Sequence, residues 1–551
     1  MRKTLAALLI IFSSLIIPSA NAGDQLEVSP SDVMKSIQPA NGSRGMLFVE
    51  NMDSLFPLGY IQYSKPDPSN MDIAATDWNL CNSWSDLNCN RSTPNRTEGY
   101  VVLGKCINTF EIGCVQDLAI QSDNGKEEPL KYVGPAASNV KDIAENLSLG
   151  IPRSSSHPIF EDSTGRLYVV RASLRVFFAS ETSKQALFNL SVDVTPVVKV
   201  ADPSIEQPET VRLPSNVNGL GIVTVRPTRE DCISIDAGIC YKALKSDPKT
   251  ILSLDLRVPT GLSGWMNGRL ANPQFSVTQL NAKSQRIKVS AQPVVMPIAG
   301  GFAKYSDLTP EFLNSIYQVG FFNTSPSASY FLVSSPSQSD TGFKDYLKWS
   351  AYFNDKALTT VTNWSFATRI NAGQQFCLKS GNEIAGIVSS NASAYSSEPP
   401  KWDAATATLS YQVASPHFDE TGKVNVGTYS LVMSTNTLRC LYSQNSLPPS
   451  ATVSVVYGND VISVATVSLK SDADWVYFSA NGFHYSNPTI QVKFAKSPPA
   501  PGSSSSIQAG SGDSSTRKIQ WCAKGYAKKK VIGANPACPK GYKKIPDPLA
   551  R

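Results

Sequence analysis

The chain has 551 residues, of which 41% are hydrophobic and 17% are charged, and its formal net charge is +6. The charged fraction is below the usual value of about 25% while the apolar content is near normal, which excludes a wholly disordered chain and a long coiled coil. At about 100–200 residues per domain, this length predicts three or four domains, each large enough to bury a core.

The first 22 residues have the pattern of a secretory signal peptide. Arg2 and Lys3 form a positive start, the stretch 5–18 is apolar, and residues 20–22 read Ala-Asn-Ala, which fits a cleavage site. An uncleaved anchor is the alternative, but the apolar run is shorter than the roughly 20 residues that a spanning helix needs. We therefore expect cleavage before Gly23 and a secreted protein, extracellular or associated with the cell wall, with no transmembrane segment after cleavage.

The cysteines predict disulfides. Their number is even, as expected for an exported chain stabilised by disulfide bonds. Three pairs repeat the interval C-x7-C, so each pair is expected to close a short loop, which leaves 377 with 440 and 522 with 538. A metal site is disfavoured, because no C-x2-C pair or nearby histidine completes a ligand set. The disulfide candidates are Cys81, Cys89, Cys106, Cys114, Cys232, Cys240, Cys377, Cys440, Cys522 and Cys538.

From residue 45 onward the chain reads as short strands separated by turns. Runs rich in β-branched and aromatic residues alternate with polar ones, which is typical of half-buried antiparallel strands. We expect an all-β fold of several stacked, immunoglobulin-like β-sandwich domains with a few short helices. The clearest predicted strands are 167–178, 286–290, 427–433 and 489–494, and the clearest predicted turns are 162–165, 419–422, 458–460 and 481–482.

Two segments have helical features. Thr309-Pro310-Glu311 reads as a cap, a first-turn proline and an acid at the positive end of a helix, and 340–358 spaces its aromatic residues in a near-helical pattern. The predicted organisation is a signal peptide 1–22, an N-terminal β-rich domain 23–200, a β-sandwich domain 201–305, a helical and strand connector 306–365, a β-sandwich domain 366–496, a Ser/Pro-rich linker 497–516 and a basic disulfide-stapled module 517–551.

The positive charge is concentrated at the C-terminus. Residues 516–551 hold ten Lys/Arg and one acid, a net charge of +9, and the signal peptide adds +2, so the body 23–515 carries −5. The Ser/Pro-rich linker predicts a flexible tether. We expect the module to bind an anionic envelope polymer, such as a cell-wall or other anionic polysaccharide, through Lys524, Lys528, Lys529, Lys530, Lys540, Lys543 and Lys544. A solubilising tail is the alternative. Trp521, Tyr526 and Tyr542 would suit single-stranded nucleic acid, but export disfavours that partner.

The sequence contains few residues of the kinds that commonly act in acid–base or nucleophilic catalysis. Its only histidines are His157, His417 and His484, and no zinc-protease, serine-hydrolase, phosphate-loop or dinucleotide motif occurs. Two acid pairs, 161–162 and 419–420, each precede Thr-Gly and are interpreted as turn residues, because Asp before Gly is common in turns. We predict no catalytic residue, no metal and no cofactor.

Two aromatic segments have two possible interpretations, a sugar-binding platform if the aromatic residues are exposed, or core packing if they are buried. Trp475 and Tyr477 alternate with apolar neighbours in a predicted strand, and Trp265 and Arg269 lie in a glycine-rich segment. Large aromatic residues dominate sandwich cores, so both segments are interpreted as structural.

The tail, Trp-Cys-x-Lys-Gly followed by Asn-Pro-x-Cys-Pro-Lys-Gly-Tyr-Lys-Lys, resembles a C-terminal module of uncharacterised exported, β-rich surface proteins of actinobacteria. Segments 257–270, 413–418 and 475–489 also resemble motifs that recur in those proteins. The resemblance implies a location at the cell surface and brings no catalytic residues. We therefore expect a non-enzymatic binding or structural surface protein; the alternative is a secreted carbohydrate-active enzyme or sugar-binding module that uses carboxylates and aromatic residues.

Overall fold

The computed structural model forms two compact units, residues 1–496 and residues 497–551, which are described separately. Among the described residues, no helix is long and apolar enough to cross a membrane. The structure describes residues 25–29, 32–33, 41–50, 58–65, 78–92, 95–122, 125–180, 182–214, 221–227, 229, 231–315, 330–334, 340–352, 355–369, 384–396, 400–403, 405–406, 408–442, 451–457, 460–463, 466–472, 474–485, 489–494, 518–524, 527–533, 537–538, 540 and 542–545. The predicted signal peptide and the whole predicted linker lie outside these residues.

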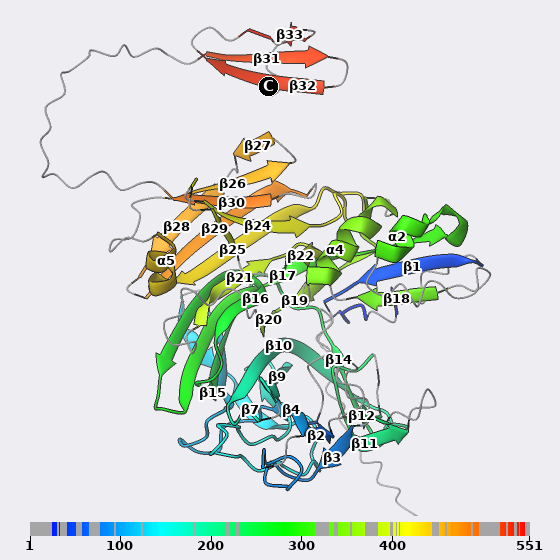
Figure 1. Ribbon diagram of the computed structural model, residues 1–551, viewed down its shortest axis with the longest axis vertical. Helices are drawn as coiled ribbons and strands as arrows, with labels where there is room; N and C mark the ends of the chain where they lie inside the picture. Colours follow the sequence, from blue (N-terminus) through cyan, green and yellow to red (C-terminus); the bar gives the residue numbers. More distant parts are fainter. Residues whose placement is uncertain are drawn as a thin grey trace, which may run out of the picture. The chain divides into compact units, whose positions relative to one another are not determined.

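The predicted all-β class is confirmed, because strands make up most of the described chain and nearly all of them pair antiparallel (Figure 1). The strands of the first half are β1 Ser43–Phe48, β2 Tyr60–Ser64, β3 Asn79–Cys81, β4 Arg96–Val102, β5 Cys114–Gln121, β6 Glu127–Pro129, β7 Lys131–Pro135, β8 Pro158–Glu161, β9 Leu167–Phe178, β10 Ala186–Ala201, β11 Glu209–Pro214, β12 Gly221–Arg226, β13 Ser234–Asp236, β14 Ile239–Ala243, β15 Ile251–Pro259, β16 Gly264–Gln279 and β17 Ser284–Lys304. The later strands are β18 Tyr330–Ser334, β19 Thr359–Asn363, β20 Ser365–Arg369, β21 Ile384–Ser390, β22 Ala394–Tyr395, β23 Lys401–Asp403, β24 Thr408–Ala414, β25 Val426–Ser434, β26 Ala451–Tyr457, β27 Asp460–Ser463, β28 Thr466–Ser471, β29 Trp475–His484, β30 Thr489–Phe494, β31 Lys518–Lys524, β32 Ala527–Gly533 and β33 Lys543–Ile545.

One long sheet runs through the first unit. Its strand order is β3-β2-β4-β9-β10-β20-β16-β21-β25-β29-β28, and every neighbouring pair is antiparallel except β16 with β21. A second sheet, β6-β5-β15-β17-β16, shares β16 with the first. Strand β16 therefore belongs to both sheets, its first half to one and its second half to the other.

The main core lies where these two sheets pack together. Alternate side chains of each strand point inward, because successive residues of a strand face opposite sides of the sheet. The first sheet contributes Leu174 and Leu190, and the second contributes Leu254 and Ile287, all with essentially no exposed surface. Burying each such aliphatic side chain stabilises the fold by about 1.5–3 kcal/mol.

A second core is formed by a sandwich in the C-terminal part of the first unit. Strands β21, β25 and β29 form one layer, and the sheet β24-β30-β26-β27, with β22 and β23 beside β24, forms the other. Leu431 and Phe478 of the first layer share a buried cluster with Tyr411 and Ile490 of the second. This packing explains why these strands alternate between apolar and polar residues.

Both predicted helices exist, and the one predicted at 340–358 is shorter than expected. Helix α2 spans Pro310–Ser315 and begins as predicted, because the Thr309 hydroxyl accepts the backbone N–H of Phe312 at 3.1 Å. Helix α4 spans Asp340–Trp349 and ends in a single 3-10 turn, Ser350–Tyr352. Helices α2 and α4 lie alongside β1 (Figure 1), where they bury Leu313 and Tyr346. A further helix, α5 Thr435–Tyr442, was not predicted; the Ser434 hydroxyl caps it.

The predicted turns at 162–165 and 419–422 are confirmed and have the same geometry. Asp162 accepts the backbone N–H of residues 164 and 166 at 2.8 and 3.0 Å, and Asp419 accepts those of residues 421 and 423 at 2.9 and 2.8 Å. The glycine in each turn, Gly165 or Gly422, has a positive φ of 86° or 90°. Asp162, Asp419 and Glu420 are thus turn residues, as the sequence indicates, whereas Glu161 is the last residue of β8.

The predicted turn at Asn481-Gly482 is wrong. Strand β29 continues through it, and Gly482, with φ of 85°, lies where the register between β25 and β29 shifts. The glycine is the extra residue of a β-bulge, which uses the same positive φ that a turn needs. Opposite it, a Cβ on Gly427 would lie 2.1 Å from the Phe483 ring, so residue 427 must be small.

The three C-x7-C disulfides are confirmed: Cys81–Cys89, Cys106–Cys114 and Cys232–Cys240, with Cα–Cα distances of 6.5, 5.0 and 5.4 Å. Cys440 and Cys538 are also disulfide-bonded. Cys377 lies outside the described residues and the side chain of Cys522 is not described, so these two pairings stay predictions. The domain boundaries predicted within the first unit also stay predictions; strands β16 and β20, assigned to different predicted segments, pair directly.

Candidate functional site

The basic module contains a three-stranded antiparallel sheet in the order β32-β31-β33. Of the predicted lysines, Lys524 ends the central strand β31, three lie on β32 and two lie on β33. The seventh, Lys540, lies in a turn before β33 and is exposed. The fold therefore gathers on one small sheet lysines that are up to 20 positions apart in the sequence.

The backbone register sets the spacing of these lysines. Cys522 on β31 has Lys529 as its Cα partner on one side and Lys544 on the other, and Ala523 is flanked in the same way by Lys528 and Lys543. Opposite Cα atoms of antiparallel strands are about 4.5–5.5 Å apart, so each flanking pair of lysine backbones is about 10 Å apart. The two pairs flank consecutive positions of β31, and consecutive positions of a strand face opposite sides of the sheet, so each side has one such pair.

The excess of positive charge makes this module a candidate receptor for negative charge. The module has one acid, Asp547, against ten Lys/Arg, and in the register of its described strands no two lysines are Cα partners. Lys543 and Lys544 are exposed, so their ammonium groups are open to a ligand. An anionic polymer that lies across the strands would neutralise several of these charges together.

One cation of the sheet was missed by the sequence analysis. Lys518 begins β31 and has Gly533 as its Cα partner, so it belongs to the same sheet as the predicted lysines. The sequence signal was present, because Arg517-Lys518 stands directly before the apolar start of the module.

Of the aromatic residues considered as a sugar-binding platform, Trp475 lies in the core, and Tyr477 and Trp265 are half-buried against it. Trp475 is 6% exposed and stacks edge-on against Phe275, with ring centroids 4.8 Å apart. Arg269 is 1% exposed, and Trp265 packs against the C-terminal core. The structural interpretation of both segments is confirmed.

Two histidines that are distant in the sequence are neighbours in space. The rings of His417 and His484 are 6.1 Å apart, and the Nδ1 atom of His417 lies 2.7 Å from the Tyr485 carbonyl oxygen, to which it donates. His157 is fully buried elsewhere, and its Nε2 atom has no hydrogen-bond partner among the described residues. Burial, with a smaller contribution from Arg171, lowers the pKa of His157 to about 3, so this ring is neutral.

Two groups of sulfur and carboxylate atoms have the proximity of a metal site. They are Cys106, Glu111 and Cys114, and Asp231, Cys232 and Cys240, each with ligand atoms within 4.8 Å. In both groups the sulfurs form a disulfide, and a metal ligand must be a thiolate. Each carboxylate instead accepts hydrogen bonds from an arginine: Glu111 from Arg153 and Asp231 from Arg229.

Comparison with protein-family models finds none that matches the chain, and comparison with curated proteins finds no match either.

Proposed function

We propose that this protein is an exported, non-enzymatic surface protein whose basic module attaches it to an anionic polymer of the cell envelope. The observation that carries the proposal is the three-stranded sheet of the module, with lysines on all three strands. The disulfides of the first unit support the exported location, because such bonds persist in oxidising compartments.

The charge distribution supports a role for the module, rather than the body, in binding an anionic polymer. The body carries −5 and the module carries +9, so the excess positive charge of the chain lies in the module. Each lysine near an anionic surface contributes about 1 kcal/mol, and salt screens this attraction over about 8–10 Å. The attachment is therefore reversible, and salt releases it.

The experiment measures binding of the full-length protein to a purified acidic wall polysaccharide as a function of salt. The variant K528Q/K529Q/K530Q removes three charges from β32 and is expected to bind at least tenfold more weakly, with a shallower salt dependence. The matched control K131Q/K199Q/K249Q removes three exposed lysines from the first unit and is expected to bind like the parent. Equal loss of binding in both variants would show that overall charge, and not the module, directs attachment.

A further inference from the structure

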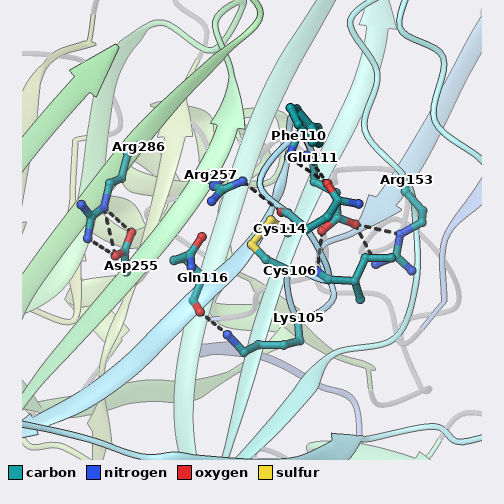
Figure 2. Close-up of a disulfide and its surroundings, with 12 residues drawn as sticks. Lys105, Cys106, Phe110, Glu111, Cys114, Gln116, Arg153, Asp255, Arg257 and Arg286 are labelled. Atoms are coloured by element: carbon teal, nitrogen blue, oxygen red, sulfur yellow. Dashed lines mark hydrogen bonds and ion pairs between the residues drawn. A yellow bond between two sulfur atoms is a disulfide. The ribbon is translucent and has the colours of Figure 1, made fainter. Parts of the chain in front are cut away.

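The loop closed by the Cys106–Cys114 disulfide is held rigid by polar contacts. The Asn108 side-chain oxygen accepts the backbone N–H groups of Phe110 and Glu111 at 2.8 and 3.1 Å. One oxygen of the Glu111 carboxylate accepts the N–H of Ile107 at 2.7 Å, and the other accepts a hydrogen bond from Arg153 at 3.0 Å (Figure 2). The loop therefore keeps its shape without help from its hydrophobic side chains.

Those hydrophobic side chains face solvent. Phe110 is 85% exposed and Ile107 is 72% exposed, and Figure 2 shows the Phe110 ring directed away from the network of Glu111 and Arg153. Neither residue contributes to any buried cluster among the described residues. A rigid loop that presents two large apolar side chains to water gains nothing in stability from them, which points to a binding role.

Two more exposed leucines occur on loops at the same end of the second sheet. Leu280, 43% exposed, lies in the turn between β16 and β17, and Leu147 is 45% exposed. Lys283 of that turn donates to the Leu147 carbonyl oxygen at 3.2 Å. Arg257, near the end of β15, donates to the Asn108 carbonyl oxygen at 3.1 Å. Loops 106–113 and 280–283 therefore lie at the same end of the second sheet, where the end of β15 pairs with the starts of β5 and β17, and loop 146–150 contacts loop 280–283. These three loops are called the loop end here.

The loop end also has cations and a pocket. A pocket of about 460 Å³ is lined by Leu147 and Ser148, by Lys184 of the β9–β10 turn, and by Thr260 and Lys283. Both lysines are exposed, and no residue that lines the pocket is acidic. One of the exposed apolar residues, Leu147, therefore lines a pocket with positive charge and hydroxyl groups at the loop end.

We propose that the loop end docks on an anionic phospholipid surface. Ile107, Phe110, Leu147 and Leu280 enter the interface, while the pocket holds a headgroup phosphate between Lys184 and Lys283. The apolar side chains protrude from separate loops, and a protruding tip suits a soft lipid interface better than the flat or hollow surface of a protein partner. The flanking cations complement anionic headgroups.

The test uses the full chain in the K528Q/K529Q/K530Q background, so that the basic module contributes little to lipid binding. Binding is measured by co-sedimentation with vesicles of equal parts phosphatidylglycerol and phosphatidylcholine. The further change I107S/F110S is expected to lower the partition coefficient at least tenfold, and F110W is expected to retain it. Vesicles of phosphatidylcholine alone are expected to bind the parent at least tenfold more weakly.

The matched control is V426S, which removes an apolar side chain that is 49% exposed on β25, outside the loop end. It is expected to bind within twofold of the parent, and circular dichroism verifies that each variant is folded. No binding of the parent to the mixed vesicles, or equal binding by I107S/F110S, would overturn the proposal. Loss of a soluble protein partner on the same change, with vesicle binding intact, would assign the loop end to a protein interface instead.

Discussion

Arg269 and Glu50 form an ion pair in which the Nη2 and Oε2 atoms are 2.7 Å apart, and both side chains are buried, at 1% and 4% exposure. The Arg269 guanidinium also donates to the carbonyl oxygen of Ser390 at 3.0 Å and stacks over the Tyr395 ring at 4.3 Å. Burial lowers the pKa of Arg269, but Glu50, Tyr395 and Tyr485 together raise it by more, so Arg269 stays charged. The ion pair and its hydrogen bonds join β16, the segment after β1 and the loop after β21.

Removing one partner of this pair leaves a buried charge uncompensated. We predict that Glu50→Ala lowers the free energy of unfolding by about 3–5 kcal/mol, measured by urea denaturation. The control is Glu128→Ala, an exposed acid on β6, which is expected to change stability by less than about 0.5 kcal/mol. A cost for Glu50→Ala no larger than that of the control would contradict this role of the ion pair.

The buried His157 predicts a loss of stability in acid. Its folded-state pKa of about 3 is below the ordinary value of about 6.5, so between these two pH values the unfolded chain takes up a proton that the folded chain does not. Stability is therefore full above about pH 6.5 and falls by about 1.4 kcal/mol per pH unit below it. Denaturation at a series of pH values is expected to show a shallower slope for His157→Leu. An identical slope would show that other groups cause the acid sensitivity.

Comparing two disulfides separates the contribution of loop closure to stability from that of packing, because both close loops of equal length. Cys81–Cys89 and Cys106–Cys114 both span a sequence separation of 8, so loop closure contributes about 2.5 kcal/mol to each. Cys81 and Cys89 lie in the main core beside Trp84, whereas Cys106 is half-exposed. We predict that C81S/C89S costs more than C106S/C114S in thermal unfolding. Equal costs would mean that packing around the first disulfide adds nothing.

Because the two turns have the same geometry, we expect a side chain at either turn glycine to lower the stability of the protein by a similar amount. Gly165 and Gly422 have φ of 86° and 90°, and the space around each is open, so the backbone conformation alone opposes substitution. Gly165→Ala and Gly422→Ala are each expected to cost about 1–2 kcal/mol in urea denaturation. A cost near zero for either would show that the turn relaxes to a negative φ.

Local patterns predict local structure in this chain and fail where partners are distant in the sequence. The predicted strands 167–178 and 489–494 coincide with β9 and β30, because alternation and turn residues define them locally. Strand β17 was predicted only over 286–290, whereas it spans Ser284–Lys304 and contains Pro293 and Pro297. Pro293 lies where β17 changes partner from β16 to β19, so its missing N–H costs little.

For the candidate site, the sequence predicts most of the residues that belong to it but not how they are arranged. The cluster of lysines can be recognised from the sequence. However, Lys529 and Lys544 flank Cys522 because of the strand register, which the sequence alone does not specify. The loop end was missed because Phe110 and Ile107 look like ordinary apolar residues until their exposure is known.

The most direct test of the proposed function is the location of the full-length protein in cells that produce it, together with the state of its cysteines. We predict that the parent is found in the envelope fraction with no thiol that an alkylating reagent labels, that salt elutes it, and that K528Q/K529Q/K530Q appears in the medium. Retention of the variant in the envelope as complete as that of the parent, or recovery of the protein inside cells with labelled thiols, would contradict the proposal.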